Sequence, residues 1–278
     1  MDTLYNKVCQ ECSKLVTNKY STSFSLGIRM FSKELRMPIY AIYGFVRFAD
    51  EIVDTFHHSD KVSLLRDFRE ETYKAIDQKV SLNPILHAFQ QVVHEYHIDH
   101  EFIDAFLDSM EMDIYPQHYD DVLLKKYIYG SAEVVGLMCL RVFLKNNHKR
   151  FAELKEQAKS LGSAFQKINF LRDIKSDFID RNRIYFPNID FERFTDEDKK
   201  HIEDDIEKEF QHALEGIQQL PASSRFGVYT AYLYYIQLFK KIKATNANTI
   251  AQKRIRVSDK RKIYLLTTSA IKFKLNLI

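Results

Sequence analysis

Apolar residues recur at helical spacing along nearly the whole chain. Side chains three or four residues apart lie on one face of an α-helix. Two sets with this spacing are Ile39, Ile42, Tyr43, Val46, Ala49 and Val53, and Phe102, Ala105, Phe106, Met110 and Ile114. The pattern predicts a chain of α-helices.

Clusters of Pro and Asn, which typically end helices, divide the apolar pattern. They are Met37-Pro38, Asn83-Pro84, Tyr115-Pro116, Asn146-Asn147-His148, Phe186-Pro187-Asn188 and Leu220-Pro221. These breaks predict helices of about 15–30 residues. Because nothing repeats at a fixed period and no low-complexity linker divides the chain, we predict a single all-α domain over residues 1–278. The densely charged stretch 190–209 is interpreted as a solvated helix or loop.

The composition excludes several fold classes. Only 7 Gly and 5 Pro occur among 278 residues, too few for the turns of an all-β fold or for a glycine-rich dinucleotide loop. A hydrophobic fraction of 45% and a charged fraction of 28% are typical of a globular protein. The net charge of +3 argues against a dedicated nucleic-acid binder, a reading that fits only the basic residues within 253–262.

The cysteine count and the apolar runs indicate a cellular location. Three cysteines, Cys9, Cys12 and Cys139, suit a reducing cytosol, and the C-x-x-C at Cys9 and Cys12 is interpreted as incidental. No segment approaches about 18 uninterrupted apolar residues, and no signal peptide is visible. The 21 Phe and 16 Tyr either fill a core or line a long apolar pocket, and composition does not choose between these roles.

The first candidate site is an acidic pair on a predicted helix. Asp50 and Asp54 are one turn apart on one face, with Arg47 three residues before Asp50. Close carboxylates repel each other unless a cation lies between them, and hard oxygen ligands suit Mg²⁺. The pair alone is a weak signal, because a solvated acidic turn has the same sequence.

The second candidate site is a polar stripe in an otherwise apolar segment. Its members, spaced 3, 4 and 4 residues apart, are Gln166, Asn169, Asp173 and Asp177. Arg172 precedes Asp173, and Arg181 and Arg183 follow the stripe. Guanidinium groups donate paired hydrogen bonds to diphosphate oxygens. The alternative is a ladder of surface salt bridges.

The duplication strengthens the functional interpretation. Two helices with aspartates four residues apart, each preceded by Arg, can face each other across a bundle and hold Mg²⁺ ions between them. Such a cluster binds diphosphate and stabilises it as a leaving group. The duplicate therefore favours a functional interpretation over coincidence.

These motifs resemble those of the squalene/phytoene synthase family, and most closely its phytoene synthases from carotenoid-making bacteria of the Bacteroidetes type. The resemblance runs in order through residues 20–24, 50–54, 127–136, 166–187 and 254–258. Its most specific part is Asn169-Phe170-Leu171-Arg172-Asp173, followed by Asp177 and Arg183-Ile184-Tyr185-Phe186-Pro187. The resemblance implies an isoprenoid-synthase-type helical bundle with a central cavity.

The resemblance also assigns roles to individual residues. It implies metal binding by Asp50, Asp54, Asn169, Asp173 and Asp177. It implies contact with substrate by Ser21, Ser23, Arg47, Gln166, Asn169, Arg172, Arg183, Tyr185, Tyr235 and Arg254. Tyr127 matches a tyrosine near the reacting carbons, whereas Tyr20 departs from the family pattern, in which some members have His.

The implied activity is head-to-head condensation of two geranylgeranyl diphosphates to phytoene with Mg²⁺, or Mn²⁺ in its place, and without NADPH. Expected partners are the prenyl diphosphates, carotenoid-pathway enzymes and, because substrate and product are lipids, the inner face of the cell membrane, through residues 263–278 of an otherwise cytoplasmic protein. One alternative is a synthase of squalene or hydroxysqualene that uses farnesyl diphosphate. Another is a non-catalytic assembly factor, but such relatives lose the aspartates.

Overall fold

A computed structural model of the chain describes residues 3–115, 119–175, 185–187 and 194–258, together with 261, 264, 265, 267 and 268. Regular secondary structure within these residues is helical throughout, which confirms the predicted all-α class. Their apolar side chains form one continuous core. The extension of a single domain over all of 1–278 stays a prediction.

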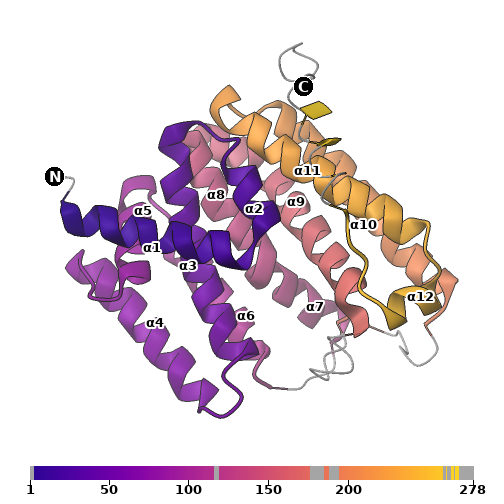
Figure 1. Ribbon diagram of the computed structural model, residues 1–278, viewed down its shortest axis with the longest axis horizontal. Helices are drawn as coiled ribbons and strands as arrows, with labels where there is room; N and C mark the ends of the chain where they lie inside the picture. Colours follow the sequence, from indigo (N-terminus) through magenta and orange to yellow (C-terminus); the bar gives the residue numbers. More distant parts are fainter. Residues whose placement is uncertain are drawn as a thin grey trace.

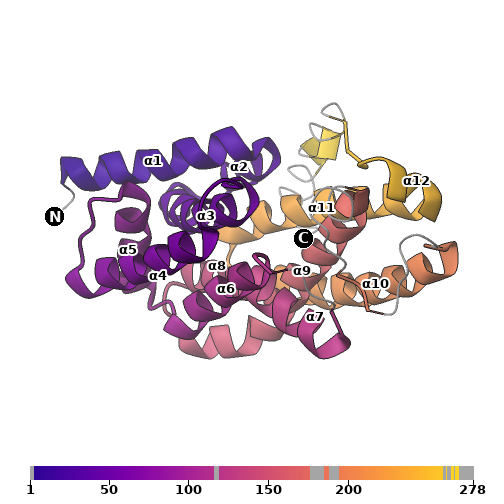
Figure 2. The ribbon, with the colours of Figure 1, turned by 90° about the horizontal axis from the view of Figure 1, so that it is seen from below.

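The N-terminal half of the chain packs around α3 (Figures 1 and 2). Its helices are α1 (Leu4–Tyr20), α2 (Thr22–Ile28), α3 (Lys33–Asp54), α4 (Lys61–Gln78), α5 (Pro84–Tyr96) and α6 (His100–Met112). In Figure 2, α1 and α2 follow each other along one surface of the molecule, with α3 beneath them.

The C-terminal half packs around α9, which lies between α8 on one side and α10 and α11 on the other (Figure 1). Its elements are α7 (Asp121–Ile128), the π-helical turn η1 (Tyr129–Glu133), α8 (Val134–Leu144), α9 (His148–Lys175), α10 (Asp196–Gln218), α11 (Ala222–Lys243) and α12 (Ala247–Gln252). Because α3 also packs on α8, the two halves form one bundle.

Most predicted helix breaks are confirmed. The Asn83 side chain accepts hydrogen bonds from the first amides of α5, which begins at Pro84. Helix α8 ends just before the Asn146 break, and Pro221 separates α10 from α11. Helix α6 ends three residues before Tyr115, although Pro116 lies outside the described residues. Phe186 and Pro187 lie between α9 and α10.

The predicted break at Pro38 is wrong, because α3 continues through this residue. Proline lacks an amide hydrogen and so removes one hydrogen bond from the helix, and its ring crowds the preceding turn. Pro38 is buried in the core between Leu35 and Ile39. Burial of the apolar face of α3 outweighs the local cost, so tertiary packing overrides the sequence signal.

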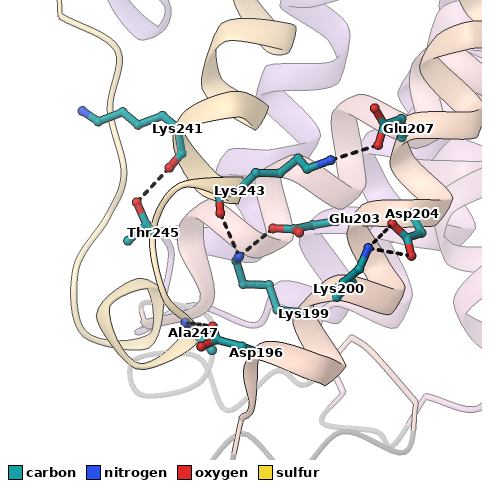
Figure 3. Close-up of polar contacts among 10 residues, drawn as sticks. All are labelled: Asp196, Lys199, Lys200, Glu203, Asp204, Glu207, Lys241, Lys243, Thr245 and Ala247. Atoms are coloured by element: carbon teal, nitrogen blue, oxygen red, sulfur yellow. Dashed lines mark hydrogen bonds and ion pairs between the residues drawn. The ribbon is translucent and has the colours of Figure 1, made fainter.

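The interpretation of residues 190–209 as a solvated stretch is also wrong in part. Lys199 and Glu203, one turn apart on α10, form a buried ion pair with 2.7 Å between Nζ and Oε1 (Figure 3). Lys199 Nζ also donates to the backbone oxygen of Lys243, and Asp196 accepts from the amide of Ala247 at the start of α12. These contacts hold the end of α11 and the start of α12 against α10.

The helical run through α7, η1 and α8 packs unusually closely on its neighbours. A Cβ atom on Gly130 would lie 2.2 Å from the backbone oxygen of Ala105 in α6, and one on Gly162 would lie 2.8 Å from the backbone oxygen of Ala132. By length and composition Asp121–Leu144 would pass for a membrane-crossing helix, but most of its apolar window is buried inside the bundle. The small residues therefore serve helix packing.

Glu133, the last residue of η1, is a largely buried carboxyl group, with Lys159 Nζ at 3.8 Å. Burial raises the pKa of this carboxyl to about 7. The charges of Lys159 and Lys167 on α9 act against that rise, whereas Glu156 on α9 and Glu209 on α10 add to it. The folded protein therefore binds this proton more tightly than the unfolded chain does.

Gly130→Ala should lower the free energy of unfolding by about 3 kcal/mol, because the new methyl group meets backbone that has no room to move. Gly27→Ala is the matched control: nothing lies within 4 Å of its added Cβ, and alanine favours the helix. Chemical denaturation of both variants measures the difference. Equal stability of the two variants would contradict the packing argument.

Glu133→Gln should remove a pH-dependent loss of stability. Because the folded-state pKa of Glu133 is raised, the wild-type free energy of unfolding falls as pH rises from about 4.5 to about 7 and levels off above that range. The variant lacks this fall. Its free energy of unfolding, relative to that of wild type, therefore increases by about 2–3 kcal/mol as the pH rises through this range. Glu156→Gln, which alters an exposed neighbour of Lys159, is the control. Parallel stability profiles for wild type and Glu133→Gln would refute the assignment.

Candidate functional site

A cavity of about 300 Å³ lies at the centre of the bundle. Side chains from α2, α3, η1, α8, α9, α10 and α11 enclose it, and most of them are apolar. Aromatic lining residues include Phe24, Phe31, Tyr43, Phe143 and Phe165. The predicted central cavity is therefore confirmed, and several of the abundant aromatic rings line it.

Three predicted site residues reach this cavity as polar groups on α9 and α11: Gln166, Asn169 and Tyr235. The Gln166 amide donates to Ser131 Oγ at 3.3 Å, and the Tyr235 hydroxyl donates to Asn169 Oδ1 at 3.3 Å. The Tyr235 ring stacks on Phe165 with 3.8 Å between centroids, and burial raises the pKa of its hydroxyl. These residues form a polar end in an otherwise apolar cavity.

Arg47 organises the acidic end of α3. Its Nη1 lies 3.5 Å from Asp50 Oδ2, its Nη2 donates to Glu51, and its guanidinium lies 4.4 Å from the Tyr20 ring centroid. Arg47 Nε is buried and has no hydrogen-bond partner among the described residues. A buried donor without a partner costs free energy, so an anion that accepts from it would bind favourably.

Asp173 lies between two arginines at the end of α9. Arg172 Nη2 is 2.5 Å from Asp173 Oδ2, and Arg254 Nε is 2.7 Å from Asp173 Oδ1. Burial alone would lower the pKa of Arg172, but its hydrogen bond and ion pair with Asp173 outweigh this effect and raise it. Arg254 is half exposed. Two guanidinium groups around one carboxylate leave donors available for further anionic oxygens.

The segment after α12 positions Arg254. Ile255 and Val257 are buried, and Lys241 on α11 donates to the backbone oxygen of Arg256 at 2.6 Å. The contacts of Asp196 and Lys199 in Figure 3 fix the start of α12 and the end of α11. These two helix ends in turn hold the segment after α12. These contacts place Arg254 next to Asp173, although the two residues are 81 positions apart in the sequence.

The two acidic groups occupy corresponding places on α3 and α9. Asp50 follows the cavity-lining Val46 by four residues, and Asp173 follows the cavity-lining Asn169 by four. Residues four apart share a helix face, so each carboxylate lies one turn beyond the cavity lining. Each is therefore placed at one end of the cavity, where Arg47, Asp50, Arg172, Asp173 and Arg254 form a charged rim.

Tyr43 and Tyr235 connect these two parts of the rim. Burial raises the pKa of the Tyr43 hydroxyl. The charge of Arg47 opposes that rise, whereas Asp50 and Tyr235 contribute to it. Tyr235 in turn interacts with Arg172 and hydrogen bonds to Asn169. The α3 and α9 clusters therefore lie close enough to interact at one end of the cavity.

Tyr127 and Tyr185 lie in a separate aromatic cluster. The Tyr127 hydroxyl donates to Asp113 Oδ2 at 2.9 Å, and the Tyr185 hydroxyl donates to Asp113 Oδ1 at 3.4 Å. The Tyr185 ring stacks on Phe170, and burial raises the pKa of Tyr127. Neither tyrosine lines the described cavity. The expected place of Tyr127 near the reacting carbons stays a prediction.

The remaining predicted residues lie around the first cluster or outside the described part of the chain. Ser21 caps α2 by accepting from the amide of Phe24, and its hydroxyl lowers the pKa of Tyr43, against the larger rise due to burial. Asp54, one turn beyond Asp50, is the last residue of α3. Asp177 and Arg183 and the side chain of Ser23 fall outside the described residues.

Sequence reasoning missed several contacts. Glu51, which pairs with Arg47, stands inside the quoted motif and carries a sequence signal. Asp113 lies after α6, far from either motif in sequence, and only its contacts with Tyr127 and Tyr185 identify it. Tyr43 was recognised as an apolar helix position, but nothing in that pattern indicated its place at the cavity.

The donor chemistry at the rim fits a divalent cation. Asp50, Asp54, Asp173 and Asn169 offer hard oxygen ligands, the type that Mg²⁺ prefers. Within the described ranges, no three Asp, Glu, His or Cys side chains come together as a metal site. Asp173 is instead held by arginines, so these oxygens would receive metal together with a bound anion.

Comparisons with known proteins show which family the chain resembles and which fold it shares. The sequence model of the squalene/phytoene synthase family matches residues 17–261. Phytoene synthase 3 of Zea mays is 29% identical over 258 residues, which cover 86% of this chain and 60% of the relative. The 15-cis-phytoene synthase of a Synechocystis strain is 27% identical, covering 92% of this chain and 82% of the relative. A crystal structure of a dehydrosqualene synthase superposes with a TM-score of 0.81 at 22% identity, covering 97% of this chain and 98% of that one.

Arg254→Gln should weaken the binding of inorganic diphosphate in the presence of Mg²⁺ about tenfold, because a charge-assisted donor at the rim is lost. Arg256→Gln removes the same charge two residues further on, whereas it is Arg254 that pairs with Asp173, and should change affinity less than about twofold. Isothermal titration calorimetry measures both. Equal losses would show that only the net charge matters.

Proposed function

The chain belongs to the squalene/phytoene synthase family, and on this basis we propose that it is a prenyltransferase that joins two geranylgeranyl diphosphates head to head to give phytoene. The observation that carries the proposal is the apolar cavity with a charged rim at its polar end. A prenyl diphosphate has the same division into a long apolar chain and an anionic head.

The arginines at the rim bind the diphosphate heads. Arg47 offers a buried donor without a partner, and Arg172 and Arg254 offer guanidinium groups next to Asp173. Diphosphate oxygens accept paired hydrogen bonds from such groups. Binding at the rim directs the attached chain into the cavity past Asn169 and Tyr235.

Asp50, Asp54, Asn169 and Asp173, with Asp177, would hold Mg²⁺. When bound, the metal stabilises the negative charge that develops on departing diphosphate oxygens. The rim arginines add to that stabilisation because their charges are fixed in place before the reaction. No nucleophilic side chain is required, and no general base is assigned.

The reaction follows from this arrangement. The C–O bond of one substrate breaks, diphosphate leaves with the electron pair, and an allylic cation remains. A double bond of the second substrate attacks that cation, and loss of a proton gives a cyclopropylcarbinyl diphosphate. Departure of the second diphosphate, rearrangement and loss of another proton give the hydrocarbon. No reductant enters this balance, so NADPH is not expected.

The cavity protects the cations. Its apolar lining excludes water, which would convert a cation to an alcohol. The faces of Phe165 and Tyr235, stacked at the polar end, can stabilise positive charge on a nearby carbon.

Geranylgeranyl diphosphate is proposed over farnesyl diphosphate because the curated relatives are named phytoene synthases. A synthase of squalene or hydroxysqualene is the competing outcome. Cytoplasmic location, contact with the inner face of the cell membrane and partnership with carotenoid-pathway enzymes stay predictions, and most of residues 263–278 fall outside the described part of the chain.

Product analysis tests the proposal. The purified protein is incubated with Mg²⁺ and either geranylgeranyl or farnesyl diphosphate, with and without NADPH, and the hydrocarbon is identified. Phytoene from the C20 substrate without NADPH is the expected result. A C30 product alone would identify the squalene-type activity, and no product from either substrate would refute the enzyme assignment.

Asp50→Ala and Asp173→Ala should each abolish turnover and leave the helical content unchanged, because both carboxylates lie at the rim outside the apolar core. Product formation and circular dichroism are the measurements. Asp121→Ala, an exposed aspartate in the first turn of α7, is the control. Turnover near the wild-type rate in either rim variant would overturn the metal assignment.

A further inference from the structure

Gln157 places a polar group among the apolar residues that line the cavity. Its amide oxygen Oε1 is buried and has no hydrogen-bond partner among the described residues. A buried polar atom without a partner costs free energy, and most such atoms in folded proteins are paired. The position of this amide in the cavity therefore calls for an explanation.

Gln157 lies far from the charged rim. The cavity-lining residues of α9 follow one stripe of the helix, from Asn169 through Gln166, Gly162 and Ala158 to Leu154. Gln157 precedes Asn169 by 12 residues in this stripe. At 1.5 Å per residue, the two positions are separated by about 18 Å along the helix axis.

Helix α10 packs closely on the base of the Gln157 side chain. A Cβ atom added to Gly216 on α10 would lie 2.4 Å from Gln157 Cβ, so the backbone of α10 confines the base of this side chain. The buried residues Phe31, Phe143 and Leu154 also line the cavity, and the two Phe rings are 5.0 Å apart. The base of the Gln157 side chain is therefore held at the cavity wall.

The reach of a prenyl chain can be compared with this distance. A C15 chain has a main chain of twelve carbons, and a C20 chain has one of sixteen. At roughly 1.2 Å per bond in an extended chain, they span about 13 Å and about 18 Å. Measured from the level of Asn169, the C20 chain ends at Gln157, and the C15 chain ends about one helical turn short of it.

We propose that Gln157 is a specificity-determining residue that reads the length of the prenyl chain. The tip of a C20 chain covers the part of the Gln157 side chain that is still accessible and removes it from water, whereas a C15 chain leaves that part uncovered. The amide thus disfavours chains that reach its level, whereas shorter chains end before it. This inference rests on the proposed function, because it assumes that the chain enters from the rim.

Gln157→Met tests the inference, because methionine keeps the length of the side chain and removes the amide. The variant should raise kcat/KM for geranylgeranyl diphosphate about tenfold and leave that for farnesyl diphosphate unchanged. Gln157→Phe should have the opposite effect, because the ring narrows the cavity at the level of residue 157: C20 turnover falls at least about tenfold and C15 turnover persists.

Gln91→Met is the matched control. Gln91 on α5 also has a buried amide oxygen without a partner among the described residues, but it does not line the cavity. Its substitution changes the same chemical group and should leave the C20/C15 ratio at the wild-type value. Gln157→Leu replaces Gln157→Met if the latter does not fold.

The readouts separate this inference from the proposed function. Calorimetric affinities for non-hydrolysable thiolodiphosphate analogues of both substrates accompany the kinetics, so chain-length discrimination is measured even without turnover. An unchanged C20/C15 ratio in both Gln157 variants, or the same shift in Gln91→Met, would overturn the role of Gln157. Absence of product with wild-type protein would refute the proposed function, and the analogue affinities would still decide the role of Gln157.

Discussion

The structure depends on a division between apolar and charged surface along the length of one helix. Helix α9 lines the cavity with apolar and small residues over most of its length, then presents Asn169 and, one turn later, Asp173. An amphipathic surface helix separates polar from apolar residues around its circumference. In α9 the separation also runs along the axis, and this provides an apolar cavity with a charged end.

The helices around α9 complete the cavity and its charged rim. Gly162 on α9 and Gly130 on η1 lack the side chains that would hold their neighbours apart, so the bundle closes tightly beside the cavity. Helix α3 adds Arg47 and Asp50 to the rim, and the segment after α12 adds Arg254. The buried Lys199–Glu203 pair belongs to the same system, because it holds the end of α11 from which that segment is positioned (Figure 3).

Charge and burial are balanced differently at the rim and in the interior. At the rim, arginines and carboxylates neutralise each other in ion pairs. An anion can bind to these arginines while a cation binds to the carboxylates. In the interior, Glu133 and the Gln157 amide lack such full compensation: burial raises the pKa of Glu133, and the Gln157 oxygen has no partner among the described residues. Under the proposed function, the rim would bind the diphosphates and Gln157 would discriminate between chain lengths.

The helical class could be predicted from the sequence, because apolar spacing and capping residues such as Asn83 are local properties. The two aspartate motifs and Arg172 could also be recognised in the sequence, because each motif lies within a few turns of one helix. Other features emerge only from the folded chain: Arg254 reaches Asp173, Pro38 lies inside a helix, and Asp113 accepts a hydrogen bond from Tyr127. The same is true of the place of Gln157 in the cavity lining. Each of these depends on packing between segments distant in sequence, which a local pattern does not encode.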